Sequence, residues 1–282
     1  MNERPAVWPP LLTFALAVPA LVVGGQALLA VWAALTLPPG VPVSGDAIAW
    51  RIQECLRQPV GLSVAVLLTS VPLAAAALVG AALSRERLAD RLRMHVAGVR
   101  WGLLPAMVLG ILALSNVLDN VLNLLGLADD GNLKLIADVI GSARGGELAL
   151  VFVVMALGAG LAEELFFRGF MQARLLRAWP PAAAIATASV AFGILHMDWV
   201  HSPVAGLLGL YLGWIAWRSG SIVPAIIAHV VNNAMAVMGA RWPLPETAGL
   251  RYALLAVSAV VGLAVVAIVE RSYRRTPSAP IR

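Results

Sequence analysis

The feature that most constrains this chain is a series of apolar segments, most of them long enough to cross a lipid bilayer. A spanning helix needs about 20 consecutive apolar residues. The chain is 60% hydrophobic and only 12% charged, whereas soluble domains are about 45–50% apolar and about 25% charged. A soluble fold could not hide this excess, because much of its surface must face water. The sequence therefore predicts an integral membrane protein.

About eight segments qualify as membrane spans. They cover residues 10–37, 59–83, 101–126, 148–172, 181–197, 203–218, 221–240 and 249–270. Helix-forming and small residues, without an alternation of period two, favour helices over a β-barrel. We predict an all-α, polytopic transmembrane helical bundle that forms a single integral membrane domain over residues 1–282. Residues 44–58 are expected to form a short interfacial helix.

The first segment raises the question of a signal peptide, because Met1 to Ala20 resembles one in its pattern. The apolar run continues to Leu37, which is longer than the usual hydrophobic region of such a peptide. A retained first helix is therefore expected.

The distribution of arginine predicts the orientation in the membrane. Loops 84–100 and 168–180 and the C-terminal tail are rich in arginine, whereas loop 127–147 is mainly acidic. Because Lys and Arg accumulate in cytoplasmic loops, these loops and both termini are expected on the cytoplasmic side. An Ala- and Arg-rich, Lys-poor composition favours a bacterial inner membrane. No basic stripe with interleaved aromatics is present in the sequence, so a nucleic-acid partner is not expected.

Two adjacent carboxylates, Glu163 and Glu164, interrupt the fourth apolar segment. An ionisable group at this depth costs at least about 2.5 kcal/mol, so it needs a partner or a function. Glu164 and Arg168 are four residues apart on one helix face and can pair. Glu163 lies about 100° around the helix and faces something else. A general base at Glu163 is one interpretation, and a structural salt-bridge cluster is the other.

Two further segments carry histidine with a partner one helical turn away. The fifth ends in Phe192-x-x-x-His196, where the aromatic ring can restrict the imidazole. The seventh contains His229-x-x-x-Asn233, which can present two hydrogen-bond donors to one point. Taken alone, His196 is more often an interfacial or packing residue than a catalytic one, and the His229–Asn233 pair more often joins helices by polar contacts than performs chemistry.

Together, the three segments supply the parts of a hydrolase. Glu163 and His196 can hold and activate a water, and His229 and Asn233 can donate to an oxyanion. We therefore predict a catalytic core formed by spans four, five and seven. This prediction requires His196, near the end of a short fifth span, to reach the depth of Glu163 and His229. Their offset is roughly 10 Å, from a rise of about 1.5 Å per residue, and a tilted or deeply starting fifth helix would close it.

These three motifs, in this order and on apolar helices, resemble the signature of the CAAX prenyl protease and bacteriocin-processing (CPBP, also ABI) intramembrane endopeptidases. The resemblance covers residues 148–240, a CAAX protease-like catalytic core. It implies an endopeptidase that acts on membrane-associated proteins or peptides. It also implies that Glu163 and His196 activate water, that His229 and Asn233 stabilise the oxyanion, and that Glu164, Arg168 and Phe192 support the site.

The residues do not decide whether the site uses a metal cofactor. Glu163, His196 and His229 could supply the three protein ligands of a catalytic site for Zn²⁺ or another divalent metal. The same residues could hold a water without a metal, as in a glutamate-type protease. Membrane lipid and a peptide or protein substrate are the expected partners.

Two other functions fit part of the pattern. A proton- or ion-coupled transporter could use Glu163, His196 and Asp119 as a relay, although the repeated halves common in transporters are not evident in the sequence. A non-catalytic bacteriocin immunity or membrane scaffold protein could retain the bundle without the chemistry.

Polar residues outside the three motifs are interpreted structurally. Asn116, Asp119, Asn120 and Asn123 lie along one face of the third span and are expected to line the bundle interior or to contact a neighbouring helix. Asp198, in the connection after the fifth span, is expected to be solvated.

Overall fold

Prolines and glycines punctuate the helices of the computed structural model, which describes residues 8–243 and 247–274. Pro59 and Pro181 stand in the first turn of α3 and α10, where a missing N–H costs nothing. Gly126 and Gly220 end α5 and α11 with φ of 71° and 73°, a left-handed conformation that favours glycine.

The helices are α1 (Trp8–Leu35), α2 (Gly45–Leu56), α3 (Pro59–Ala82), α4 (Leu88–Arg91), η1 (Trp101–Leu103), α5 (Leu104–Leu125), α6 (Asn132–Ser142), α7 (Gly145–Val151), η2 (Phe152–Ala159), α8 (Gly160–Glu164), η3 (Leu165–Gln172), α9 (Ala173–Leu175), α10 (Pro181–Leu195), α11 (His201–Ser219), α12 (Val223–Arg241) and α13 (Ala248–Arg274).

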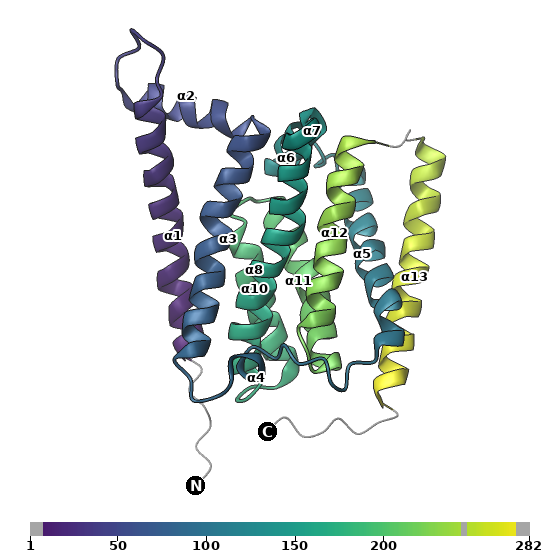
Figure 1. The fold of residues 1–282 in the computed structure, drawn as a ribbon. Helices are drawn as coiled ribbons and strands as arrows, with labels where there is room; N and C mark the ends of the chain where they lie inside the picture. Colours follow the sequence, from purple (N-terminus) through teal and green to yellow (C-terminus); the bar gives the residue numbers. More distant parts are fainter. Residues whose placement is uncertain (1–7, 244–246, 275–282) are drawn as a thin grey trace.

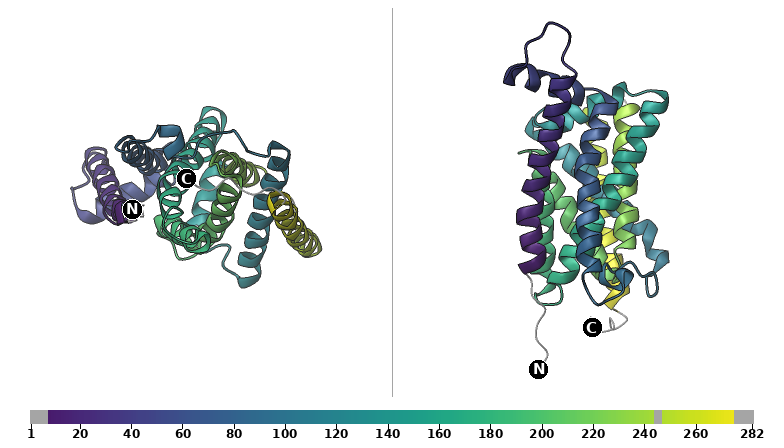
Figure 2. Two further views of the ribbon diagram at one scale, coloured as in Figure 1. Left: turned by 90° about the horizontal axis from the view of Figure 1, so that it is seen from below. Right: turned by 60° about the vertical axis from the view of Figure 1, so that its left-hand side comes forward.

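The long helices run side by side as a bundle (Figure 1). α1 and α13 lie at opposite edges, and both the side view and the view from below show this arrangement (Figure 2). The start of α1 and the end of α13 lie at the same end of the bundle, which also carries α4, whereas α2 crosses the other end (Figure 1). The described residues form helices and connections without strands, so the predicted all-α transmembrane bundle is confirmed.

The number of spans is supported only in part. Within the described residues, five helices are long and apolar enough to cross a membrane: Pro59–Ala82, Trp101–Leu125, Gly145–Leu175, Val223–Arg241 and Ala248–Arg274. The fifth predicted span corresponds to α10, a shorter apolar helix. The count of about eight, the cytoplasmic placement of the termini and the single domain stay predictions. The proposed signal-peptide segment lies partly outside the described residues.

The helical run Gly145–Leu175 is the most buried of the five and forms the centre of the bundle. On one side of it, Phe166, Phe167 and Phe192 pack edge to face within the largest apolar cluster. A second cluster joins α5, α11, α12 and α13. This central position places the two glutamates of the run away from lipid, where the neighbouring helices can supply polar partners.

Two connections differ from their expected form. Residues 127–147, interpreted as an acidic loop, contain α6, which packs against α12 and buries Val139 and Ile140. The interfacial segment forms α2, and the Ser44 hydroxyl caps it by accepting from the Ala47 amide at 3.2 Å.

The polar face of the third span serves helix packing. Asn116 accepts a hydrogen bond from the Ser258 hydroxyl of α13 at 3.1 Å. Asn120 is buried and donates to the Asn116 carbonyl at 2.8 Å. These contacts favour the interpretation of this face as a contact with a neighbouring helix.

Candidate active site

Glu163 and Glu164 lie on α8, a short α-helical stretch between two π-helical segments. π-Helical turns are rare and frequently occur at functional sites, because the extra residue re-aims the side chains that follow. Glu164 is fully buried, whereas the Glu163 side chain remains 14% exposed. The two carboxylates therefore occupy different environments, as their 100° separation on the helix predicted.

Glu164 forms the predicted ion pair with Arg168. The guanidinium Nη1 donates to Glu164 Oε1 at 2.6 Å, and both side chains are 0% exposed. Arg168 also donates through Nη2 to the Gly209 carbonyl of α11 at 3.0 Å. Its guanidinium lies 4.7 Å from the centroid of the Phe192 ring. Arg168 thus joins the central helical run to both α10 and α11.

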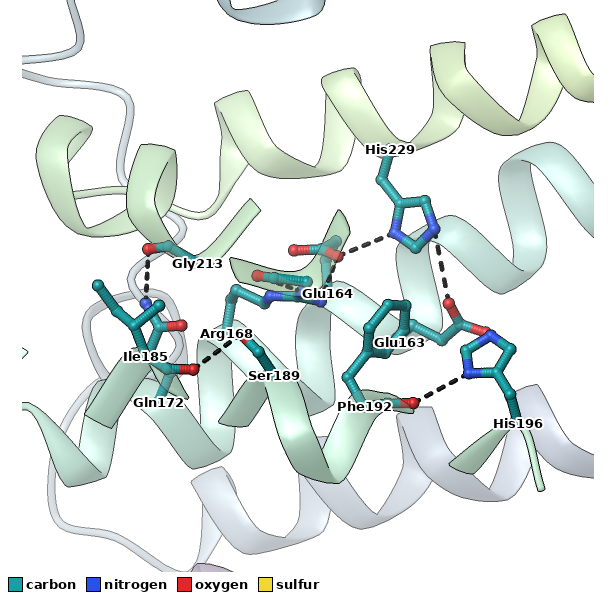
Figure 3. A network of polar contacts seen from close by, with 11 residues as sticks. Glu163, Glu164, Arg168, Gln172, Ile185, Ser189, Phe192, His196, Gly213 and His229 are labelled. Atoms are coloured by element: carbon teal, nitrogen blue, oxygen red, sulfur yellow. Dashed lines mark hydrogen bonds and ion pairs between the residues drawn. The ribbon is translucent and has the colours of Figure 1, made fainter. Parts of the chain in front are cut away.

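His229 of α12 is held between the two carboxylates (Figure 3). Its Nδ1 lies 2.9 Å from Glu164 Oε1, and its Nε2 lies 3.6 Å from Glu163 Oε2. A carboxylate paired with arginine only accepts hydrogen bonds, so Nδ1 carries a proton and donates it to Glu164. This contact fixes the ring orientation and turns Nε2 towards Glu163.

His196 follows the last residue of α10 and is restrained by Phe192, as predicted. Its Nδ1 donates to the Phe192 carbonyl at 2.9 Å, and the two rings meet edge to face with centroids 5.0 Å apart. Because Nδ1 is committed to a carbonyl, Nε2 of the neutral ring is left as an acceptor. In the view of Figure 3, this edge of the imidazole is turned towards Glu163.

The helix α10, which corresponds to the fifth predicted span, brings His196 to the depth of Glu163. α10 has only 15 residues, so it ends within the bundle rather than at its far side. Met197 follows with φ of 47°, a left-handed conformation unusual for methionine, where the chain turns back into α11. Glu163 and His196 consequently line the same cavity.

This cavity has a volume of about 480 Å³ and lies between the central helical run, α10, α12 and their neighbours. Every polar residue that the motifs singled out for chemistry lines it: Glu163, His196, His229 and Asn233. Phe192 also lines it, whereas Glu164 and Arg168 lie behind it and contact the lining residues. Much of the remaining wall is apolar, including Met155, Leu208 and Leu212.

Asn233 departs from the expected geometry. Its side-chain amide donates to the Met155 carbonyl of η2 at 3.1 Å, while His229 donates to Glu164. In this arrangement the Asn233 amide and the His229 ring donate to different acceptors, not to one point. Residues four apart share a helix face, but the helices packed against that face decide which acceptor each meets.

Two cavity residues were missed by the sequence motifs. Asn232 is buried, and its Oδ1 has no donor among the described residues. The His201 ring lies with its centroid 4.3 Å from that of His196. Both line the cavity. Adjacency to Asn233 was a signal for Asn232, whereas His201 follows a turn whose path the sequence does not reveal.

Asp198 is not simply solvated, contrary to expectation. Its carboxylate accepts from the amides of His201 and Val200 at 2.7 and 3.0 Å, and from the Asn132 amide of α6 at 2.9 Å. Although burial opposes ionisation, these amides hold the pKa of the Asp198 carboxyl below its usual range. Asp198 therefore ties the turn after His196 to the start of α6.

The three proposed metal ligands were tested against this geometry. A catalytic zinc site needs three protein donors directed at one point. Within residues 8–243 and 247–274, no group of three His, Cys, Asp or Glu side chains is arranged to hold a metal ion. His229 and His196 commit Nδ1 to Glu164 and to the Phe192 carbonyl, as histidine ligands of metals commonly do, and their Nε2 atoms are left for a ligand. The residue types therefore suit a metal, but their placement in this arrangement does not form a three-ligand site.

Comparison with known proteins agrees with the motifs. Residues 145–235 match the family model described as type II CAAX prenyl endopeptidase Rce1-like. No curated protein and no solved structure matches the chain significantly. The matched segment contains Glu163, His196, His229 and Asn233, together with the residues that support them. The predicted resemblance is thus confirmed: residues 145–235 of this integral membrane protein are similar to the Rce1-like endopeptidases, a family of proteases.

Proposed function

We propose that this protein is an intramembrane endopeptidase that hydrolyses peptide bonds of membrane-associated proteins or peptides. The observation that carries this proposal is the convergence of Glu163, His196 and His229, from separate helices, on one cavity inside an apolar bundle. A buried ion pair and two hydrogen bonds hold the imidazoles in place. Charged groups are costly at this depth, so such a cluster favours a function over a purely structural role.

The proposed reaction begins with a water between Glu163 and His196. Glu163 takes one proton as the water oxygen bonds to the peptide carbonyl carbon, and His196 Nε2 accepts a hydrogen bond from the other O–H. The tetrahedral oxyanion then collapses and the C–N bond breaks. Glu163 returns its proton to the leaving nitrogen, so the products are a carboxylic acid and an amine.

Oxyanion stabilisation is assigned to His229 and Asn233. His229 can donate from Nε2 only while both ring nitrogens carry protons, because its Nδ1 proton is given to Glu164. Asn233 has a second N–H besides the one donated to Met155. Donors of this kind typically contribute about 2.7–4 kcal/mol of transition-state stabilisation.

The substrate class follows from the cavity. Its apolar walls and its position between spans suit an extended peptide segment that enters from the membrane or its surface. The arginine-rich end of the bundle is proposed to face the cytoplasm, and the membrane is proposed to be a bacterial inner membrane.

The test is peptide cleavage by the purified protein in detergent. Glu163→Gln keeps the side-chain shape and removes the base, so we expect cleavage to fall by at least about 100-fold. Glu147→Gln is the matched control, because Glu147 lies on the same helical run and is exposed. Unchanged thermal stability of both variants shows that folding is intact. Full activity of Glu163→Gln would refute the proposal.

The same assay with a chelator addresses the cofactor. The donor geometry favours a water held by side chains alone, so we expect cleavage to persist after prolonged treatment with excess chelator. Loss of activity that Zn²⁺ restores would instead assign Glu163, His196 and His229 as metal ligands. Those ligands would bind through the Glu163 carboxylate and the two Nε2 atoms, and the Nδ1 hydrogen bonds described above would stay in place.

A further inference from the structure

A second polar site lies on α4, at the end of the bundle where α1 begins and α13 ends (Figure 1). It is built around Arg91, the last residue of α4, which is only 3% exposed. Its Nε and Nη1 atoms are both buried and find no acceptor among the described residues. Arginine keeps its charge in proteins, so this group cannot avoid the cost of burial by losing its proton.

The backbone around Arg91 is firmly held. The next residue, Leu92, is completely buried in the largest apolar cluster. Arg93 follows with φ of 56°, and its carbonyl accepts from the Ile222 amide between α11 and α12 at 2.9 Å. The backbone that carries Arg91 is therefore fixed by its neighbours on the chain.

The charges around Arg91 are mostly of the same sign. Burial, together with the nearby Arg177 and Arg174, lowers the pKa of Arg91, and only Glu86 opposes this effect. Glu86 is itself engaged in an ion pair with Arg177. Arg93 is also partly buried on the same segment. Within the described part of the chain, Glu86 is the one carboxylate that offsets the guanidinium groups around Arg91, so the site has an excess of positive charge.

We propose that the cluster of Arg91, Arg93 and Arg177 binds the phosphate of an anionic lipid headgroup. Two N–H groups of one guanidinium can bind two oxygens of a phosphate side by side. Basic pockets at the cytoplasmic ends of spans are suited to such headgroups. The segment around the site exposes Leu83, Val96 and Trp101 at 84%, 53% and 43%, as expected of chain that meets the acyl and interfacial region. This environment favours a lipid over a soluble anion.

The experiment measures lipid binding by native mass spectrometry of the detergent-solubilised full chain. Phosphatidylglycerol is compared with phosphatidylcholine, and inorganic phosphate is added as a competitor. The variants are Arg91→Gln, Arg91→Lys and the control Arg87→Gln, which removes an exposed arginine from the same segment. We expect Arg91→Gln to bind phosphatidylglycerol about tenfold more weakly than wild type, since a factor of ten corresponds to about 1.4 kcal/mol.

Arg91→Lys keeps the charge and loses the two-pronged geometry, so an intermediate loss is expected. Arg91→Lys also tests the proposal if Arg91→Gln does not fold. Displacement of the lipid by millimolar phosphate would support the phosphate site and assign it to a soluble source. Equal affinity of Arg91→Gln and Arg87→Gln, or no preference of wild type for phosphatidylglycerol over phosphatidylcholine, would overturn the proposal. Peptide cleavage does not enter this measurement, so the result is independent of the proposed protease activity.

Discussion

At the scale of single residues, the burial of charge divides the ionic groups into two kinds. Glu164 and Arg168 are completely buried and pair with one another, whereas Glu86 and Arg177 form their ion pair at the surface. Removing one partner of a buried pair leaves an uncompensated charge in the bundle. Removing one partner of a surface pair leaves a charge that water can solvate.

This difference predicts that Glu164→Gln destabilises the protein more than Glu86→Gln does. The buried change strands Arg168 and should lower the free energy of unfolding by about 3–5 kcal/mol. The surface change should lower it by less than about 1 kcal/mol. Thermal unfolding in detergent measures both. Comparable losses would mean that the Glu164–Arg168 pair contributes no more than a solvent-exposed contact.

A second prediction concerns His201 and rests on the proposed function. Its ring lies against that of His196 in the cavity wall, so it is a positioning residue for His196. Removing the ring in His201→Ala should lower the peptide cleavage rate by about 10- to 100-fold, the range that a small misplacement of a catalytic group costs.

His201→Phe distinguishes positioning from proton transfer. Phenylalanine keeps an aromatic ring beside His196 but cannot exchange a proton, so cleavage should largely recover. If His201→Phe were as inactive as His201→Ala, the nitrogen atoms of His201 would be required, and a role in packing alone would be ruled out.

At the scale of elements, the position of His196 depends on how closely α10 approaches α11. A Cβ at Gly193 would lie 2.6 Å from the Ser202 carbonyl and 3.3 Å from the Cα of Gly206. Small residues at such crossings allow helix backbones to pack in direct contact. Because His196 is one turn beyond Gly193, this contact sets where the imidazole enters the cavity.

Gly193→Ala should therefore displace α11 from α10. The expected cost is about 1–3 kcal/mol of stability, as for other overpacked sites, with a loss of cleavage activity as His196 shifts. Gly206→Ala is the control on the same interface, since its Cβ would meet the Ser189 carbonyl at an ordinary 3.6 Å. A thermal stability of Gly193→Ala equal to that of Gly206→Ala would show that the crossing tolerates a methyl group.

At the scale of the whole molecule, the arginine-rich loops and the polar site of Arg91 lie at one end, and α2 lies at the other (Figure 1). Cys55, the only cysteine, belongs to α2. The positive-inside rule predicts that the arginine-rich end faces the cytoplasm. The chain can therefore be oriented by thiol labelling once Cys55 has been replaced.

In a Cys55→Ala background, Asp129→Cys and Arg87→Cys place exposed thiols in the acidic and the arginine-rich connections. A membrane-impermeant thiol reagent should label Asp129→Cys in intact cells, and Arg87→Cys only after the membrane is permeabilised. The reverse pattern would invert the proposed orientation, and labelling of both in intact cells would argue against a membrane crossing by α5, which lies between the two positions.

The sequence by itself determined the features that depend on local geometry. Apolar segments of sufficient length predict helices in a membrane, and a repeat of 3.6 residues per turn brings Glu164 beside Arg168 and Phe192 beside His196. These contacts need only the helix on which both residues lie. The family motifs depend on the same spacings, and so they could be recognised without coordinates.

Only the tertiary structure decided how the separate helices meet. The early end of α10 brings His196 to Glu163, and the carbonyl of Met155 takes the amide of Asn233 away from its expected direction. His201 and Asp198 gain their partners from a turn and from the start of α6. The depth of each helix relative to its neighbours, its rotation about its axis and the acceptor that each donor meets all arise from the packing of many side chains across helices. No residue spacing within a single helix encodes them.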